Sequence, residues 1–329
     1  MSAGIRSAAD ILSRVVEEVD AADRRIRPSV RETPLALSPN LSAALNATVL
    51  LKLENTQVTG SFKVRGAVNR LLTMPLSQRE LGVITASTGN HGAAVAYAAH
   101  KLSMRCTVLV PAGASLAKVG AIRAWGATIE EHGTDGLHAE QEARRRADAQ
   151  GVFYLSPYND PGVVVGQGTV GAELARQTER LDAVFIAVGG GGLIAGTAAY
   201  LKARNPDTVV IGCSAEASNV MYQSVKAGSI LNLPSAPTLS DGTAGGVEAD
   251  AMTFPLCRNL VDRWENVSEA EIAEAMRAAI DQDHQLIEGA AGVALAAARK
   301  LAPEFPRGTI GVVLCGGNVG TSTLRRVLS

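Results

Sequence analysis

The chain has 329 residues, of which 47% are hydrophobic and 19% are charged, and its formal net charge is −1. This composition is typical of a globular enzyme and excludes a disordered chain, while the length predicts two lobes. A near-neutral charge without a long basic block excludes the electrostatic footprint of a nucleic-acid-binding protein.

The N-terminal stretch 8–27 mixes acidic residues such as Glu17 and Asp20 with apolar ones. It predicts an amphipathic surface helix and not a secretory signal peptide. The chain has no CxxC pair, and at this size it needs no disulfide staples. We therefore expect a cytoplasmic protein with reduced thiols at its four cysteines, Cys106, Cys213, Cys257 and Cys315.

Short β-branched runs alternate with longer helical patterns along the rest of the chain. This alternation predicts an α/β fold with mainly parallel strands and helices on both sheet faces. Strands are expected at 49–53, 82–85, 105–110, 128–131, 183–188, 209–214 and 309–314, and helices at 92–101, 116–125, 137–149, 169–180, 194–203, 269–283 and 290–301.

Two breaks in this pattern suggest lobe boundaries. One lies near Pro75, and the other is the Pro/Asn/Asp cluster at 156–161, which is typical of a connection. The piece between them holds strand–helix repeats of its own. We therefore predict a large domain from 1–77 plus 159–329, and a small inserted domain from 78–158.

The first candidate for chemistry is Lys63, which follows Gly60 and Ser61 and stands at the start of a helical pattern. A deprotonated lysine can form a Schiff base with an aldehyde cofactor, and burial or nearby cations favour that form. Its spacing alone favours a solvated lysine on the first turn of a helix, because lysines are mostly exposed.

The second candidate is Ser87-Thr88-Gly89-Asn90-His91-Gly92, between a predicted strand and a predicted helix. Its hydroxyls, its amide and the free N–H groups of a helix start would make a cradle for a carboxylate. Asn90 could instead be a turn residue, and His91 a capping or core histidine. No histidine has the spacing of a metal ligand, so we expect no metal at these positions.

The third candidate is the run Gly189-Gly190-Gly191-Gly192-Leu193, between an apolar strand and a helical pattern. Glycine N–H groups and a helix dipole would bind an anion such as a phosphate monoester. The uncharged segment 183–201 is long enough to span a bilayer, but the four glycines inside it favour a strand, a turn and a helix start. We therefore expect no membrane span.

A rival interpretation of the glycine run is a nicotinamide dinucleotide site. Residues 190–195 satisfy G-x-G-x-x-A, and Glu216 follows the next predicted strand. A nicotinamide-dependent oxidoreductase would, however, leave Lys63 and Asn90 without a role. The fourth candidate, Cys315, ends a further strand, and it is either an inert buried thiol or a weak donor to a ring nitrogen.

Together these four segments resemble the fold-type II pyridoxal phosphate (PLP) enzymes, in particular the serine/threonine dehydratase and serine racemase group. The similarity runs from about residue 26 to residue 328. It implies a tryptophan synthase β-like fold with two open, twisted, mainly parallel sheets flanked by helices. No segment is left for the regulatory domain of biosynthetic threonine dehydratases, so the short, catabolic type is expected, as a homodimer.

The resemblance implies cofactor-binding roles at matching positions. Lys63 would hold PLP as a Schiff base, be released by the substrate amine and then remove the α-proton. Phe62 would pack beside the pyridine ring, Asn90 would hydrogen-bond the 3′-oxygen, and Cys315 would face the ring nitrogen. The phosphate would be bound by Gly189, Gly190, Gly191, Gly192 and Leu193.

The resemblance also implies substrate-binding positions. Gly242 and Glu288 would line the same pocket, and the substrate carboxylate would be held by Ser87, Thr88, Asn90 and His91. Thr88 is also a catalytic candidate, because racemases of this group carry a serine there that works on the opposite face of the substrate. Threonine keeps the hydroxyl but restricts its rotamers, so elimination ranks above racemisation.

The expected reaction is conversion of a threonine- or serine-type β-hydroxy amino acid to a 2-oxo acid and ammonia. A thiol at the ring nitrogen does not enforce its protonation as an Asp would, which suits loss of a β-substituent over transamination. Alternatives are a dehydratase of a hydroxyectoine-derived amino acid, to which the variant at 85–91 is also similar, a dehydratase of threo-3-hydroxyaspartate, a serine racemase, and a PLP-binding protein without catalysis.

A divalent metal is not expected. Glu216 matches the glutamate of the group's metal site, but Tyr222 stands where the second carboxylate would be. One carboxylate with carbonyl groups makes a poor Mg²⁺ or Ca²⁺ site.

Overall fold

The computed structural model describes residues 8–134 and 136–329, and their strands form two sheets. The larger sheet has the strand order β1-β2-β10-β7-β8-β9, and the smaller one β5-β4-β3-β6. The larger sheet consists of β1 (Leu35–Leu37), β2 (Thr48–Lys52), β10 (Thr309–Val313), β7 (Ala183–Ala187), β8 (Val209–Ala215) and β9 (Arg263–Val267). The smaller sheet consists of β5 (Thr128–Glu131), β4 (Cys106–Val110), β3 (Val83–Ala86) and β6 (Phe153–Tyr154).

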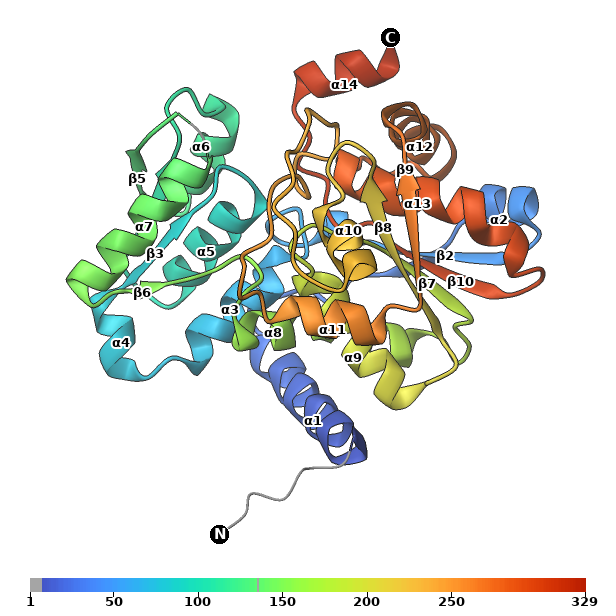
Figure 1. Ribbon diagram of the computed structural model, residues 1–329, viewed down its shortest axis with the longest axis horizontal. Helices are drawn as coiled ribbons and strands as arrows, with labels where there is room; N and C mark the ends of the chain where they lie inside the picture. The colour runs from blue at the N-terminus through green and yellow to red at the C-terminus, as the bar shows by residue number, and fades with distance from the viewer. Residues whose placement is uncertain (1–7, 135) are drawn as a thin grey trace.

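Helices flank both sheets (Figure 1). They are α1 (Ala8–Ile26), α2 (Pro39–Leu45), α3 (Lys63–Thr73), α4 (Leu76–Leu81), α5 (Asn90–Lys101), α6 (Leu116–Arg123), α7 (Gly136–Gln150), α8 (Pro161–Gln177), α9 (Gly192–Arg204), α10 (Val220–Ala227), α11 (Thr253–Leu260), α12 (Glu269–Asp283), α13 (Gly289–Leu301) and α14 (Thr321–Leu328). Two 3₁₀ turns, Glu54–Thr56 and Ala302–Glu304, complete the described elements.

The sheets are mainly parallel. Among the described strands, only β1 and β2 pair antiparallel. The central strand β7 is buried along its whole length, as an apolar strand between helix layers should be. The predicted α/β fold with two mainly parallel sheets flanked by helices is therefore confirmed.

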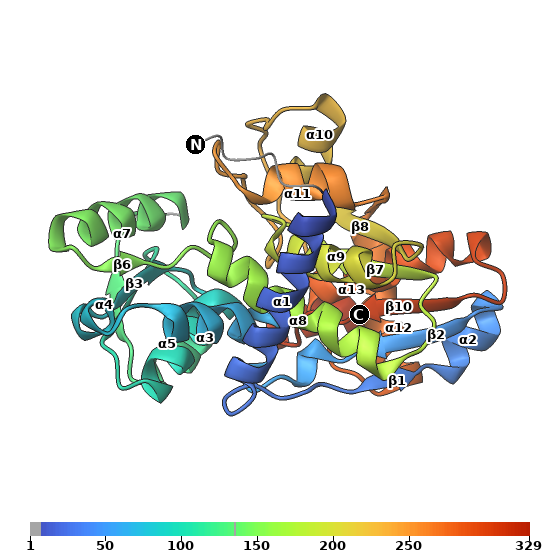
Figure 2. The same ribbon diagram turned by 90° about the horizontal axis from the view of Figure 1, so that it is seen from below.

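The two sheets belong to separate parts of the chain. The smaller sheet with α5, α6 and α7, here called the small lobe, lies within 83–154, and the larger sheet takes strands from both sides of that range. Helices α3 and α8 lie between the two sheets in both ribbon views (Figures 1 and 2). The exact division at 78–158 stays a prediction, and residues 1–7 and 135 of the predicted domains lie outside the described residues.

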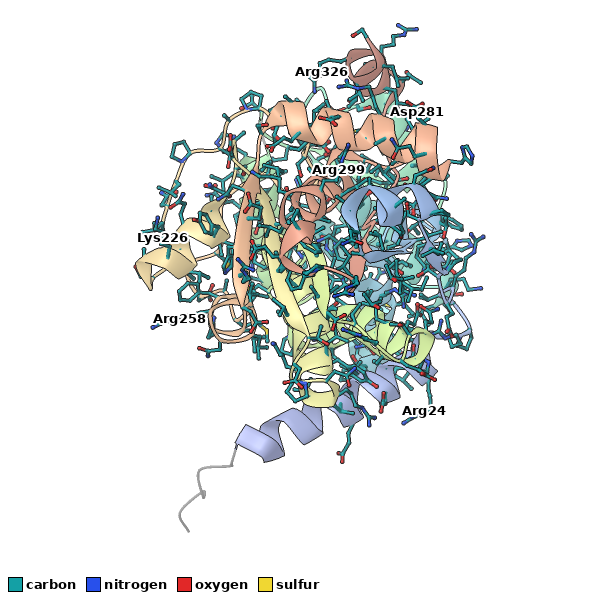
Figure 3. All side chains as sticks on the ribbon, turned by 90° about the vertical axis from the view of Figure 1, so that its right-hand side faces the viewer. Arg24, Lys226, Arg258, Asp281, Arg299 and Arg326 are labelled. Atoms are coloured by element: carbon teal, nitrogen blue, oxygen red, sulfur yellow. The ribbon has the colours of Figure 1, made fainter. Side chains whose placement is uncertain are left out.

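Charged side chains such as Lys226, Arg258 and Arg326 point outward from the larger sheet's helices (Figure 3). The interior holds one charged cluster, at the junction of β2, α3 and α8, made of Lys52, Glu54, Arg65 and Glu173. No helix in the described ranges is long and apolar enough to cross a membrane. Segment 183–201 forms β7, a glycine turn and most of α9.

The predicted strand positions agree with the structure to within two residues, but three strands were not predicted. β1 and β6 have only three and two residues, and β9 reads Arg-Trp-Glu-Asn-Val at a sheet edge, so none presents an apolar run.

The predicted helix at 169–180 was placed wrongly, because α8 begins eight residues earlier. Asp160 accepts a hydrogen bond from the Val163 N–H, and Pro161 occupies the first helical position, so part of the expected connection is a helix cap. The glycines of this helix weakened the pattern, yet Gly166 is needed: an added Cβ would lie 2.7 Å from the Arg65 carbonyl oxygen on α3.

Candidate active site

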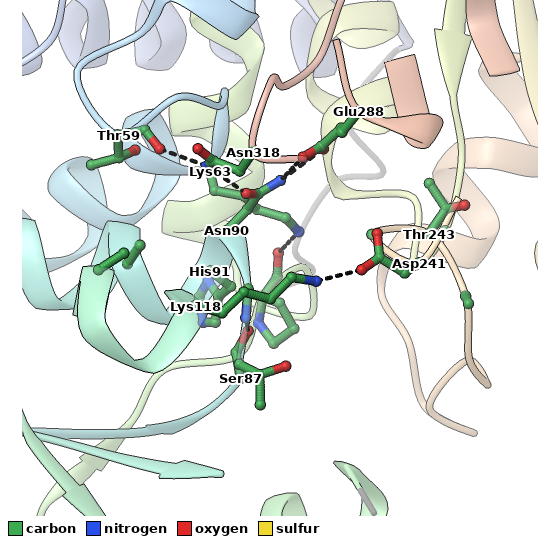
Figure 4. Close-up of a pocket in the computed structure, with 18 of the residues that line it drawn as sticks. Thr59, Lys63, Ser87, Asn90, His91, Lys118, Asp241, Thr243, Glu288 and Asn318 are labelled. Carbon is green, nitrogen blue, oxygen red and sulfur yellow. Dashed lines mark hydrogen bonds and ion pairs between the residues drawn. The ribbon is translucent and has the colours of Figure 1, made fainter. Parts of the chain in front are cut away.

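A cavity of about 780 Å³ is lined by segments of the small lobe and of the larger sheet's loops (Figure 4). A narrower hollow of about 40 Å³ shares with it Lys63, Asn90 and the start of the glycine run. All the predicted site residues lie at one or both: Phe62, Lys63, Ser87, Thr88, Asn90, His91, Gly189, Gly190, Gly191, Gly192, Leu193, Gly242, Glu288 and Cys315.

Lys63 is the first residue of α3, and its side chain points into the cavity and not into bulk solvent (Figure 4). Its Nζ donates to the Pro157 carbonyl oxygen at 3.1 Å and lies 5.1 Å from the centre of the Phe62 ring. Burial lowers the pKa of Lys63 to about 8, against the opposing charges of Cys315 and Glu288. A substantial fraction of this amine is therefore neutral, and nucleophilic, near physiological pH.

The start of α3 is held on two sides. The Phe62 N–H donates to the Cys315 carbonyl oxygen at 3.0 Å. Arg65 lies two residues beyond Lys63, and its Nε and Nη1 meet carboxylate oxygens of Glu54 and Glu173, each at 2.7 Å. All three charged side chains are fully buried, so the cluster fixes the first turn of the helix that carries Lys63.

The glycine run forms a close-fitting turn at the start of α9. An added Cβ at Gly189 would lie 2.8 Å from the Thr243 carbonyl oxygen, and one at Gly190 would collide with the Tyr158 ring. Gly191 has a φ of +85°, which favours glycine. The first N–H groups of α9 lack helical acceptors and lie at the positive end of the helix dipole. The turn is therefore a cradle for an anion.

Asn90 is oriented by hydrogen bonds on both sides of its amide (Figure 4). Its Nδ2 donates to the two carboxylate oxygens of Glu288 at 2.7 and 2.9 Å. Its Oδ1 accepts from Asn318 Nδ2 at 2.8 Å, and Asn318 Nδ2 also donates to the Thr59 carbonyl oxygen. Burial raises the pKa of Glu288 to about 7, although the Asn90 hydrogen bonds oppose this.

The Ser87–Gly92 segment follows β3 and starts α5. Ser87 Oγ accepts from the Gly89 N–H at 3.3 Å, and the His91 Nε2 lies 3.0 Å from the Leu155 carbonyl oxygen. Burial, with the charge of Lys63, lowers the pKa of His91 to about 3, so its ring is neutral. The hydroxyls of Ser87 and Thr88 and the N–H groups at the start of α5 remain as the polar groups of this segment facing an anion.

Cys315 lies just beyond β10, buried beside the narrower hollow. Burial, with the nearby Glu288, raises the pKa of this thiol far above its usual range. It is therefore a neutral, weak hydrogen-bond donor in this site.

The two positions considered for a metal lie apart from this cavity. Glu216 is exposed beyond the end of β8, and the Tyr222 ring lies 5.9 Å from the ring of Trp264. The described part of the chain has no group of three or more His, Cys, Asp or Glu side chains that could hold a metal ion.

Sequence reasoning missed three features near the site. One is the buried cluster around Arg65, another is Asn318, and the third is an ion pair between Lys118 of α6 and Asp241, both at the cavity. Asn318 stands only three residues after Cys315 and was open to recognition, whereas Lys118 and Asp241 are 123 residues apart and share no local pattern.

The residues of the cavity fit PLP. A glycine cradle that a Cβ would fill suits its phosphate, and an amine with a lowered pKa suits its aldehyde. A neutral thiol and an oriented amide lie in the same hollow, where the ring nitrogen and the 3′-oxygen would need partners.

Comparisons with known proteins agree with this fit. The family model described as "Pyridoxal-phosphate dependent enzyme" matches residues 26–316. A "Putative threonine dehydratase" of Sinorhizobium fredii is 37% identical over 315 residues, covering 95% of each chain. An "L-threo-3-hydroxyaspartate ammonia-lyase" of a Pseudomonas species is 37% identical over 92% of this chain and 94% of that protein. The solved structure of processed threonine deaminase isoform 2 from Solanum lycopersicum has a TM-score of 0.93 and 32% identity, covering 98% of this chain and 93% of that chain.

Proposed function

Because this chain belongs to the family of pyridoxal-phosphate-dependent enzymes, we propose that it is an ammonia-lyase that converts a β-hydroxy amino acid to a 2-oxo acid and ammonia. The observation that carries the proposal is the Lys63 amine, whose pKa is lowered to about 8, in one cavity with the glycine cradle. The names of the two 37%-identical relatives supply the reaction class. Membership of this family sets aside the nicotinamide-dependent alternative.

In this proposal PLP is held by the residues of the narrower hollow. Lys63 holds its aldehyde carbon, Phe62 packs beside its ring, Asn90 donates to its 3′-oxygen and Cys315 faces its ring nitrogen. Its phosphate is held by Gly189, Gly190, Gly191, Gly192 and Leu193. When bound, PLP supplies the electron sink for the pair that proton removal leaves on the substrate's α-carbon.

The chain's own residues bind the substrate and move its protons. The α-carboxylate is held by the hydroxyls of Ser87 and Thr88 and by N–H groups at the start of α5, including that of His91. Lys63 accepts the α-proton at Nζ, because its lowered pKa places the amine within reach of its neutral form. Glu288, with a pKa near 7, is the acid that supplies a proton to the leaving hydroxyl.

The preference for elimination rests on the neutral Cys315 thiol, because it leaves the ring nitrogen without an anionic partner. Racemisation remains the second candidate, because Thr88 places a hydroxyl in the same cavity. The substrate's identity, among threonine, serine, threo-3-hydroxyaspartate and a hydroxyectoine-derived amino acid, stays open, and homodimer formation and a cytoplasmic location stay predictions.

A substrate panel tests the proposal. The purified PLP-loaded protein is incubated with these β-hydroxy amino acids, and 2-oxo acid, ammonia and optical purity are followed together. Release of 2-oxo acid and ammonia in equal amounts, abolished by Lys63→Ala, supports a lyase. Loss of optical purity without 2-oxo acid would make the protein a racemase. PLP binding that survives Lys63→Ala would overturn the assignment of Lys63.

A further inference from the structure

A long loop covers one side of the main cavity. The structure describes all of 228–252, between α10 and α11, and finds only turns there. Unstructured connections of this length within a compact fold usually have a function. We call its part from Asp241 to Asp250 the 241–250 loop; five of its residues line the cavity, Asp241, Gly242, Thr243, Ala244 and Gly246.

The end of this loop nearest α11 is firmly attached. Glu248 forms an ion pair with Arg144 of α7 at 2.8 Å, and its carboxylate accepts from Asn159 Nδ2 at 2.9 Å. Its N–H donates to the Tyr158 hydroxyl at 2.9 Å. Asn159 also accepts from the Met252 N–H at 2.9 Å. Several bonds to the small lobe and to the segment after β6 thus hold this end.

The other end depends on one contact with the small lobe. Lys118 of α6 pairs with Asp241 across the cavity (Figure 4). Their side chains are 35% and 60% exposed, in contrast to 19% for Glu248. Exposed pairs of this kind shift an equilibrium by at most about fivefold, and salt weakens them. This end of the loop is therefore the releasable one.

The loop also contacts the predicted cofactor and substrate positions. The Thr243 backbone packs so closely on Gly189 that an added Cβ there would lie 2.9 Å from the Thr243 Cα. A Cβ added at Gly242 would lie 3.5 Å from a Glu288 carboxylate oxygen. The position of the Asp241 end thus sets the wall of the cavity at both the glycine cradle and the acid.

We propose that Lys118 is a positioning residue whose ion pair with Asp241 acts as a latch between α6 and the 241–250 loop. With the latch closed, Gly242 and Thr243 stand over the bound substrate. With it open, the loop turns about its fixed Glu248 end and the cavity mouth widens. The kinetic part of this proposal rests on the proposed lyase function, whereas the position of the loop does not.

The test combines kinetics with the fluorescence of Trp125, which lines the cavity just beyond α6. The chain has two tryptophans, so a Trp264→Phe background leaves Trp125 as the sole reporter. Four PLP-loaded variants are compared in that background: Lys118→Met, Asp241→Asn, the charge swap Lys118→Asp with Asp241→Lys, and Arg263→Met. The last is the control, because Arg263 forms a similarly exposed ion pair with Glu304 away from the cavity.

The latch predicts that Lys118→Met and Asp241→Asn each raise KM by about threefold to fivefold, with a smaller change in kcat, and expose Trp125 to acrylamide quenching. The charge swap restores both quantities to within about twofold, and 0.5 M salt has the effect of Lys118→Met in the parent but adds nothing in that variant. Unchanged quenching in Lys118→Met, or a swap as impaired as the single variants, overturns the latch. If no amino acid is turned over, the proposed function fails, and the quenching comparison on the PLP-loaded protein still decides the latch.

Discussion

The Nδ2 of Asn90 donates to both carboxylate oxygens of Glu288, at 2.7 and 2.9 Å, and so ties the start of α5 to the residue before α13. The contact joins the small lobe to the larger sheet's helices inside the cavity. It also places a carboxyl group where burial raises its pKa from 4.5 to about 7. A polar group held in this way carries a free-energy cost that depends on pH.

Replacing this carboxyl group changes how stability depends on pH. Because the pKa of Glu288 is higher in the folded than in the unfolded chain, its ionisation costs stability as pH rises from 4.5 through 7. The free energy of unfolding of Glu288→Gln apoprotein, relative to the parent, should therefore increase by about 3 kcal/mol between pH 5 and pH 8. Urea unfolding at several pH values measures this difference. A difference that stays flat across this range would contradict the raised pKa.

The pKa of Lys63 predicts the rate at which the apoprotein captures PLP. Only the neutral amine attacks an aldehyde, and burial lowers the pKa of Lys63 to about 8. The rate should rise about tenfold per pH unit below that value and level off above it. Stopped-flow absorbance of the lysine-bound cofactor follows the reaction, with free lysine as the control. A rise that continues to pH 10 would show an ordinary, solvated amine.

Much of the fold followed from local patterns, because buried parallel strands such as β7 and β10 are short apolar runs. The site segments could also be predicted, since three of them follow strands β3, β7 and β10, whose carboxyl ends meet at cavities in this kind of fold. The contacts between distant residues could not. Arg65 meets Glu173 over 108 positions, and Lys118 meets Asp241 over 123, and no periodicity or spacing encodes such a pair.

The buried charged cluster predicts a large loss of stability when one partner is removed. Glu173 accepts from Arg65, Lys52 and Arg27, so Glu173→Gln leaves buried cations short of a counter-charge. The expected loss is about 3–5 kcal/mol at pH 7. Guanidinium unfolding measures it, and Glu304→Gln, which disrupts an exposed pair with Arg263, should cost less than about 1 kcal/mol.

The same residue predicts sensitivity to acid. Burial alone would raise the pKa of Glu173, but Arg65 and Lys52 outweigh it and lower the pKa from 4.5 to about 2. Its ionised form therefore stabilises the fold fully above pH 4.5, and this contribution is lost as pH falls towards 2. The gap in stability between the parent and Glu173→Gln should shrink between pH 5 and pH 3. A gap that grows on acidification would mean that Glu173 is protonated in the folded protein.

The glycine cradle predicts that a single methyl group abolishes tight cofactor binding without unfolding the protein. In Gly190→Ala the new Cβ would collide with the Tyr158 ring, and the ring cannot retreat freely because its hydroxyl accepts from the Glu248 N–H. The turn must shift, and its N–H groups lose their common direction towards an anion. We expect the Kd for PLP to rise at least about tenfold, which corresponds to about 1.4 kcal/mol.

Gly120→Ala is the matched control for this change. Gly120 lies in α6, and an added Cβ there meets no atom within 4 Å, so alanine should leave PLP binding intact and stabilise the helix by up to about 1 kcal/mol. Fluorescence titration of each apoprotein with PLP gives the Kd, and thermal unfolding shows whether Gly190→Ala still folds. Equal Kd values for the two variants would mean that the phosphate is held elsewhere, and the assignment of Gly189–Gly192 to it would be wrong.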